Sequence, residues 1–258
     1  MFVSSIENLS YVTDEYTRLY YGNEFCQERI PTPDEMRYVY DFARSRGLQL
    51  TWVTPYVTER GLEALRPLAA FVASAAKDSE FVVNDWGAWR VLHDEYGCTN
   101  FVLGRLLAQQ KRDPQISRMR KETSGAAFED FQQAVADASI MAPFLRERKI
   151  ARIEIDNLLQ GIKRPKASLP ASLYLPYVFV STTKFCPLAC AWPSARVARN
   201  QGACSRQCNE RGFTLRHRVM PVPLYLYGNA YFFKHERLPA RVREYNINRM
   251  VWQPEIPF

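Results

Sequence analysis

The alternation of strand-like and helix-like segments is the feature that most constrains this chain. Eight short segments rich in Val, Tyr, Phe and Leu have the composition of strands, and helical patterns lie between several of them. Repeated strand–helix units imply parallel strands with right-handed crossovers. Eight such strands in 258 residues predict an α/β fold of the (β/α)8 TIM-type barrel, formed as one domain over residues 1–258. The expected strands are 16–22, 48–54, 80–83, 100–103, 150–155, 174–181, 224–227 and 249–252.

Helix signals support this order. Thr32 can cap a helix whose first turn holds Pro33 and two acidic residues, and Gly47 can end it. Further helices are expected over 59–76 and 87–96. Only 15 residues precede the first expected strand. The first strand–helix unit is therefore expected to be trimmed or absent, which would leave the barrel incomplete at its N-terminus.

Two regions interrupt the alternation. Residues 105–138 form a predicted insertion, with a basic run over 111–121 and an amphipathic helix over 128–138. Residues 184–220 show no clear strand or helix but hold four of the six cysteines. Long loops without secondary structure are usually functional in compact domains. We expect the second region to be a cysteine-rich loop at the C-terminal mouth of the barrel.

The strongest chemical signal is a set of four cysteines with the spacing C-x3-C-x13-C-x3-C. Thiolates held close together repel one another unless a cation lies between them, so the pattern favours zinc or an iron–sulfur cluster. Cys26 follows the strand expected over 16–22 and would also lie at the mouth. Cys98 precedes the strand at 100–103, on the opposite face, and is interpreted as structural. The four cysteines are Cys186, Cys190, Cys204 and Cys208.

The sequence lacks the marks of several other classes of protein. It begins without a basic segment followed by a long apolar run, and no stretch reaches the roughly 18–20 apolar residues that cross a bilayer. We expect a cytoplasmic protein whose thiols stay reduced. The glycine-rich motifs of nucleotide-binding folds are absent, as are HExxH, the GxSxG elbow and a Cys–His pair. These absences weigh against hydrolases of familiar design.

The net charge is +7, and the excess gathers in two stretches. Such patches can bind phosphate backbones, but no reading motif for nucleic acid is evident. The sequence therefore allows nucleic acid as a partner without favouring it over a solvated surface or a bound anion. One stretch is Lys111, Arg112, Arg118, Arg120 and Lys121, and the other includes Arg196, Arg199, Arg206, Arg211, Arg216, Arg218, Lys234, Arg237, Arg241, Arg243 and Arg249.

Polar residues follow several expected strands, where a barrel builds its sites. Asn84 and Asp85 end one strand, Arg105 follows the next, and Glu154 and Asp156 project from one face of a third. An inward carboxylate near the mouth is a candidate acid, base or anchor. Asp85 is also well placed to cap the helix after it. Glu154 is interpreted as functional rather than as a loop-bonding group.

Several segments together resemble one family. Val83–Gly87 (VNDWG) and 101–107 (FVLGRLL) are similar to successive strand ends of the peptidase U32 (collagenase-like) family. Residues 200–208 (NQGACSRQC) resemble its cysteine signature, and 227–229 and 247–254 fit its later part. Residues 22–29 (GNEFCQER) resemble most closely the UbiU/UbiV-type iron–sulfur proteins of oxygen-independent hydroxylation. The resemblance extends from about residue 16 to the end.

The resemblance implies a [4Fe-4S] cluster held by Cys26, Cys186, Cys204 and Cys208. Cys190 is an additional thiol that could replace Cys186 or Cys26 as a ligand. It also implies a heterodimer with a related chain, and a substrate that is a ubiquinone-type aromatic precursor or an RNA base. The mouth residues Glu24, Asn84, Asp85, Arg105 and Glu154 would then position an anionic or aromatic substrate.

Two other functions stay open. The chain could be a non-catalytic partner subunit whose zinc or iron–sulfur site is structural. A peptidase, as the family label states, ranks last, because no nucleophile–base pair is present.

Overall fold

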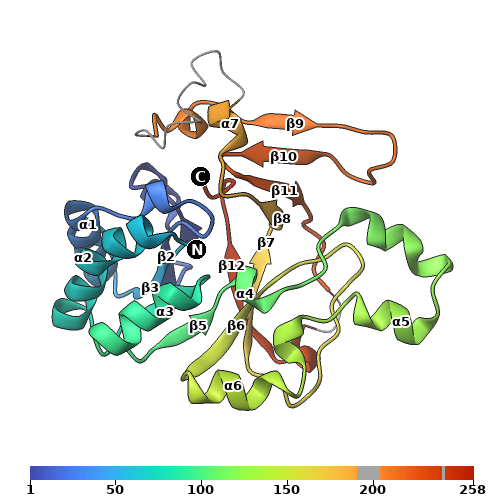
Figure 1. The fold of residues 1–258 in the computed structure, drawn as a ribbon, viewed down its shortest axis with the longest axis horizontal. Coiled ribbons are helices and arrows are strands. Elements are labelled where there is room, and N and C mark those ends of the chain that lie inside the picture. Colours follow the sequence, from blue (N-terminus) through green and yellow to red (C-terminus); the bar gives the residue numbers. More distant parts are fainter. Residues whose placement is uncertain (191–203, 240–241) are drawn as a thin grey trace.

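Eight parallel strands surround a common interior in the computed structural model, which describes residues 1–190, 204–239 and 242–258. They follow one another in the order β1-β2-β3-β4-β5-β6-β7-β12, and each neighbouring pair is parallel. Their arrangement can be followed in Figure 1. The strands are β1 (Phe2–Val3), β2 (Arg18–Gly22), β3 (Gln49–Val53), β4 (Glu80–Val83), β5 (Phe101–Leu103), β6 (Ile150–Asp156), β7 (Ala171–Leu175) and β12 (Ile247–Trp252).

The two ends of this sheet meet in the interior. Phe2 from β1 and Val251 from β12 belong to the same buried hydrophobic group, with one residue each from five other strands. The rings of Phe2 and Tyr174, on β1 and β7, lie 6.0 Å apart at an edge-to-face angle. Strands from both ends of the sheet therefore share one inner layer, as in a barrel. The predicted (β/α)8 TIM-type fold is confirmed.

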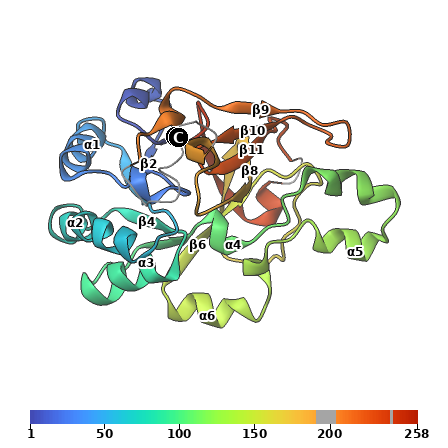
Figure 2. The ribbon, with the colours of Figure 1, turned by 45° about the horizontal axis from the view of Figure 1, so that its top comes forward.

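Helices α1 (Pro33–Ser45), α2 (Glu59–Ala75) and α3 (Trp86–Arg90) cover one side of the barrel (Figures 1 and 2). The predicted start of α1 is correct: Thr32 accepts a bond from the Glu35 N–H while the Glu35 carboxylate accepts one from the Thr32 N–H. A π-helix, Val91–Glu95, continues α3. Apolar residues of these helices join the outward-facing residues of the strands in the main hydrophobic core.

The barrel is not missing its first strand. The first strand–helix unit is trimmed, as expected, but it is not absent: β1 is only two residues long, below the length at which composition reveals a strand. A 3₁₀ helix, Glu7–Tyr11, stands between β1 and β2 in place of an α-helix.

The expected insertion, 105–138, is a chain of short helices between β5 and β6. It holds α4 (Arg105–Ala108), the 3₁₀ helices Pro114–Lys121 and Val135–Asp137, and α5 (Gly125–Asp130), and α6 (Met141–Glu147) follows it. The helix predicted over 128–138 was wrong, since α5 ends at Asp130. Ala134 instead forms a bridge with Gln110, and the Val135 N–H donates to the Gln109 carbonyl, which draws the chain out of helical geometry.

A second, antiparallel sheet lies beside the barrel mouth, with strand order β8-β11-β10-β9. It corrects two predictions. The strand expected over 174–181 is two strands in different sheets, because Pro176 has no N–H to continue a ladder. The strand expected over 224–227 belongs to this sheet and not to the barrel. Its strands are β8 (Tyr177–Thr182), β9 (Phe213–Leu215), β10 (Leu224–Tyr227) and β11 (Ala230–Lys234).

The cysteine-rich region follows β8 and contains β9, so it begins and ends within this second sheet. Within it the described residues form α7 (Pro187–Cys190), a 3₁₀ helix at Gln207–Asn209, and β9. The prediction that it held no helix or strand was therefore wrong for these short elements. Another 3₁₀ helix, Arg243–Tyr245, precedes β12. No helix of the described residues is both long and apolar enough to cross a membrane.

Candidate metal centre

Four free thiols from three separate segments lie close enough at the barrel mouth to interact electrostatically. Cys26 lies in the loop after β2, Cys186 precedes α7, and Cys204 and Cys208 lie at the 3₁₀ helix Gln207–Asn209. Burial, with smaller contributions from the thiols of Cys204, Cys208 and Cys186, raises the pKa of Cys26 to about 12. The sequence-predicted set of four thus interacts electrostatically across more than 150 residues of chain.

The loop that carries Cys26 is held by one buried amide. The Asn23 Oδ1 accepts the N–H groups of Phe25, at 2.9 Å, and Cys26, at 2.8 Å. Its Nδ2 donates to the Pro257 carbonyl at 2.9 Å. The Phe25 ring stacks on Phe179, with ring centroids 4.6 Å apart. The position of the Cys26 thiol is therefore fixed by both a turn and a hydrophobic anchor.

Cationic and amide groups surround the other sulfurs. The Arg29 guanidinium donates to the Cys208 Sγ at 3.3 Å, and the Arg206 N–H donates to the Cys204 Sγ at 3.4 Å. Burial raises the pKa of Cys186, while the amides of Ala189 and Leu188, at the start of α7, oppose that rise. These donors would favour thiolates over thiols once a cation is present.

Cys190, the alternative ligand, is the last residue of α7, and its side chain lies outside the described part of the structure. Among the described residues, no group of three or more His, Cys, Asp or Glu is arranged to hold a single metal ion. The four described thiols are close enough to perturb one another but do not form a single-ion site.

Beside the thiols lies a buried network of two carboxylates and two guanidiniums. Arg105 pairs with Glu24 and, at 2.7 Å, with Asp156; the other oxygen of Asp156 contacts Arg112 at 2.7 Å. Glu24, Arg105 and Asp156 are completely buried. Burial raises the pKa of Glu24, and Arg105 opposes that rise. Since Glu24 is two residues from Cys26, this network positions the loop that carries that thiol.

Glu154 lies deeper, inside the barrel. Its Oε1 accepts the Tyr20 hydroxyl at 3.2 Å, and its Oε2 has no partner among the described residues. Burial raises the pKa of Glu154 to about 8, which keeps the carboxyl protonated at neutral pH. The Arg249 guanidinium donates to the same Tyr20 hydroxyl at 2.7 Å. Glu154 is thus a neutral acid in the barrel interior.

Asn84 and Asp85 bind backbone groups. The Asn84 side chain donates to the Thr54 carbonyl at 2.9 Å and accepts the Leu106 N–H at 3.1 Å. Asp85 accepts the Ala88 N–H at 3.1 Å and caps α3. In the structure these two residues hold strand ends, whereas Glu24 and Arg105 contact each other.

Sequence reasoning identified one further member of this region and missed another. The alternation of β6 placed Asp156 on the same face as Glu154, as a candidate inward carboxylate. Arg112 stood within a basic run, and nothing in its sequence context distinguishes a buried cation from its exposed neighbours. In the structure it is buried, paired with Asp156, and it also donates to the Gln110 and Arg105 carbonyls.

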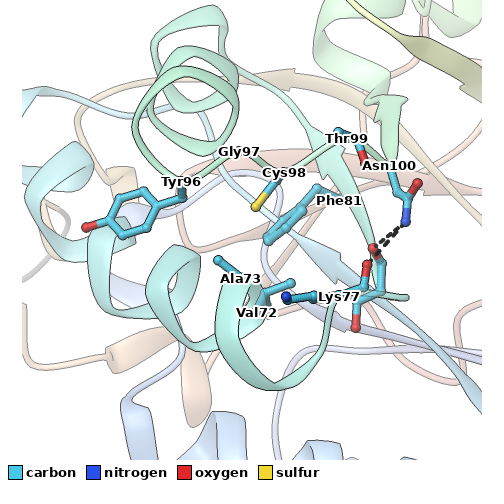
Figure 3. A pocket seen from close by; sticks show the side chains of 10 residues that line it. Val72, Ala73, Lys77, Phe81, Tyr96, Gly97, Cys98, Thr99 and Asn100 are labelled. Atoms are coloured by element: carbon cyan, nitrogen blue, oxygen red, sulfur yellow. Dashed lines mark hydrogen bonds between the residues drawn. The ribbon is translucent and has the colours of Figure 1, made fainter.

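The fifth described thiol lies elsewhere. Cys98 is half-buried in a pocket of about 290 Å³ near the starts of β4 and β5, which is the opposite end of the barrel from Cys26 (Figure 3). Burial raises the pKa of its thiol. The apolar residues that line this pocket with Cys98 include Val72, Phe81 and Tyr96.

Solved structures that are similar to this chain include a peptidase and a glycoside hydrolase. No family model matches the sequence, and no curated protein does. The U32 peptidase Mk0906 is similar over 99% of this chain and 92% of its own, with 15% identity and a TM-score of 0.49. A glycoside hydrolase family 18 N-acetylglucosaminidase from Paenibacillus barengoltzii is similar over 97% and 93%, with 9% identity and a TM-score of 0.37. Neither comparison assigns an activity to this chain.

Proposed function

We propose that this protein holds a [4Fe-4S] cluster on Cys26, Cys186, Cys204 and Cys208, and that it is a component of an oxygen-independent hydroxylation system. The observation that carries the proposal is the convergence of four free thiols from three distant segments. Neighbouring thiols that raise the pKa of Cys26 and Cys186 have no stabilising role by themselves, but the four form a ligand set once iron lies between them.

The donor set fits this group. All four ligands are thiols, which is the usual ligation of such a cluster. Four thiolates can also hold one zinc ion, with bonds of about 2.3 Å. Zinc on the same thiols is therefore the alternative to the cluster.

Bound there, the cluster would supply one-electron transfer. The chain's own residues have separate tasks around it. Arg29 donates a hydrogen bond to the Cys208 sulfur, which is the kind of contact that tunes a reduction potential. Phe25 and Phe179 exclude water beneath the Cys26 loop. Glu24 and Arg105 hold that loop in place.

The class of substrate follows from the resemblance to the UbiU/UbiV-type proteins. This resemblance favours a ubiquinone-type aromatic precursor as the substrate, with an RNA base as the other substrate of such systems. It also favours a related chain as the partner in a heterodimer. A protein of this kind works in the cytoplasm.

One observation favours the alternative of a non-catalytic partner subunit. Four of the predicted substrate-binding side chains already form hydrogen bonds or ion pairs within the protein: Asn84, Asp85, Glu24 and Arg105. Few mouth groups then remain to bind a substrate. In this alternative the cluster, or a zinc ion, is structural, and a partner chain contributes the catalytic groups.

The decisive experiment is anaerobic purification followed by iron and acid-labile sulfide analysis. We expect a brown protein with about four irons and four sulfides per chain. Cys26→Ser should lose most of both, while the matched control Cys98→Ser, whose thiol lies at the other end of the barrel, should keep them. A colourless protein that carries zinc would overturn the proposal. Full iron in Cys26→Ser would remove Cys26 from the ligand set.

A further inference from the structure

Two basic stretches that are about 100 residues apart in sequence meet on one surface. The Arg118 guanidinium, on the 3₁₀ helix Pro114–Lys121, donates to the Val219 carbonyl in the turn between β9 and β10 at 2.7 Å. Figures 1 and 2 both show this turn and the insertion side by side, away from α1 and α2. The fold thus unites charges that the sequence keeps apart.

The cations on this surface are exposed and have no carboxylate partners. Among the described residues, none of the ion pairs uses them, and each is exposed to solvent. Glu122 is the acidic residue directly after this 3₁₀ helix. Like charges that lie close together repel one another, and a bound anion offsets that repulsion. This surface is therefore suited to bind an anion. We call it the hairpin basic surface: Arg118, Arg120, Lys121, Arg216 and Arg218.

Apolar side chains are exposed on the same β9–β10 hairpin that carries Arg216 and Arg218. Phe213 on β9 is 40% exposed, and Leu215 and Val219 are each 43% exposed. All three residues of β9 are exposed. An exposed aromatic ring contributes nothing specific to the binding of an acidic protein or a free anion. A nucleic-acid base stacks on such a ring, while its phosphates meet the cations on either side.

We propose that the hairpin basic surface binds single-stranded nucleic acid, with Phe213 as a stacking position and the five cations as phosphate contacts. Two basic segments placed along one surface suit an extended polyanion better than a single phosphate. Binding of this kind does not depend on the four thiols. Its failure and the failure of the proposed iron–sulfur function are therefore seen in separate measurements.

The test is fluorescence anisotropy of the full chain with a labelled 20-nucleotide oligouridine, repeated over a range of salt concentrations. The double variant Arg216→Glu/Arg218→Glu should bind at least tenfold more weakly, and its log–log salt slope should fall by about 1.4, or about 0.7 per lost contact. The matched control is Arg37→Glu/Arg44→Glu on the exposed face of α1, on the far side of the molecule, which should stay within twofold of the unaltered chain.

Phe213→Ala separates stacking from charge. It should weaken binding severalfold while leaving the salt slope unchanged. A labelled poly-glutamate of equal charge serves as the second probe. Oligouridine binding that survives Arg216→Glu/Arg218→Glu, or that falls equally in the α1 control, would overturn the assignment of this surface. Equal affinity for poly-glutamate, with no effect of Phe213→Ala, would overturn nucleic acid as its ligand. A deoxythymidine oligomer of the same length shows whether the site prefers RNA.

Discussion

A single carboxyl, Glu154, shows how strongly the barrel interior controls residue chemistry. It is completely buried, and its hydrogen-bond partner is the neutral hydroxyl of Tyr20. Arg249, which could have paired with it, is instead paired with Glu80 at 2.7 Å. Without a direct cation, desolvation decides the protonation state, and the pKa of Glu154 rises to about 8.

This rise makes stability depend on pH in a defined direction. The unfolded chain loses the Glu154 proton near 4.5, whereas the folded chain keeps it up to about 8. Between these values the folded state binds more protons, so stability falls as pH rises, by at most about 1.4 kcal/mol per pH unit. Glu154→Gln, which keeps an oxygen for Tyr20, should remove this contribution. Urea unfolding at pH 5, 6, 7 and 8 would show it.

The comparison to make is the difference between the two stability curves, because other groups titrate in both proteins. As pH rises from 5 to 8, the free energy of unfolding of Glu154→Gln should increase relative to that of the unaltered chain. Parallel curves would mean that Glu154 is ionised in the folded protein, with a cation or water supporting its charge.

At this scale the sequence was informative where a residue acts through its own strand or helix. Asp85 caps α3 as its position after β4 allowed, and Glu154 points inward as alternation on β6 required. It was uninformative where a role depends on a distant partner. Arg112 is buried because Asp156 lies 44 residues away in sequence and 2.7 Å away in space.

At the scale of elements, one buried network ties together the ends of three strands. Glu24 follows β2, Arg105 begins α4 after β5, and Asp156 ends β6. Ion pairs at this depth recover their desolvation cost only when every member is present. The network should therefore tolerate joint replacement better than the loss of one member.

Arg105→Met should destabilise the fold by about 3–5 kcal/mol, because it leaves Glu24 without its cation in a dry environment. Adding Glu24→Gln should recover part of that loss. The matched control is Arg66→Met, which breaks a solvent-exposed pair with Glu95 and should change stability little. Guanidinium unfolding of the unaltered chain, Arg105→Met, Glu24→Gln and the double variant gives the coupling energy directly. Additive losses from Arg105→Met and Glu24→Gln would contradict a coupled network.

Elements with a full local signal were predicted well, and short ones were not. The acidic first turn and the Thr32 cap located α1, and the long apolar pattern located α2. Strand β1 is two residues long and β9 is three, so neither shows an alternation. The antiparallel sheet was missed for another reason: its strands pair β8 with β11 across some fifty residues, and no local pattern records that pairing.

At the scale of the whole molecule, the four thiols lie where the barrel meets the second sheet. Cys26 belongs to a barrel loop, whereas Cys208 leads into β9 and Cys186 follows β8. Phe25 reinforces this junction from the barrel side by packing on Phe179 of β8 and Phe232 of β11. A bound iron–sulfur cluster would thus cross-link the two sheets, and its binding energy would add to the folding energy of both.

Loss of iron should therefore lower the melting temperature of the whole chain. A ligand that binds only the folded state far above its dissociation constant stabilises it by about 4 kcal/mol, which for a chain of this size shifts the midpoint on the order of 10 °C. Calorimetry of anaerobically purified protein, before and after chelation, would measure the shift. Cys98→Ser should show the same shift, whereas Cys26→Ser should melt at the chelated value throughout. A midpoint that is unchanged by chelation in iron-loaded protein would mean that the thiols do not join the two sheets through the metal.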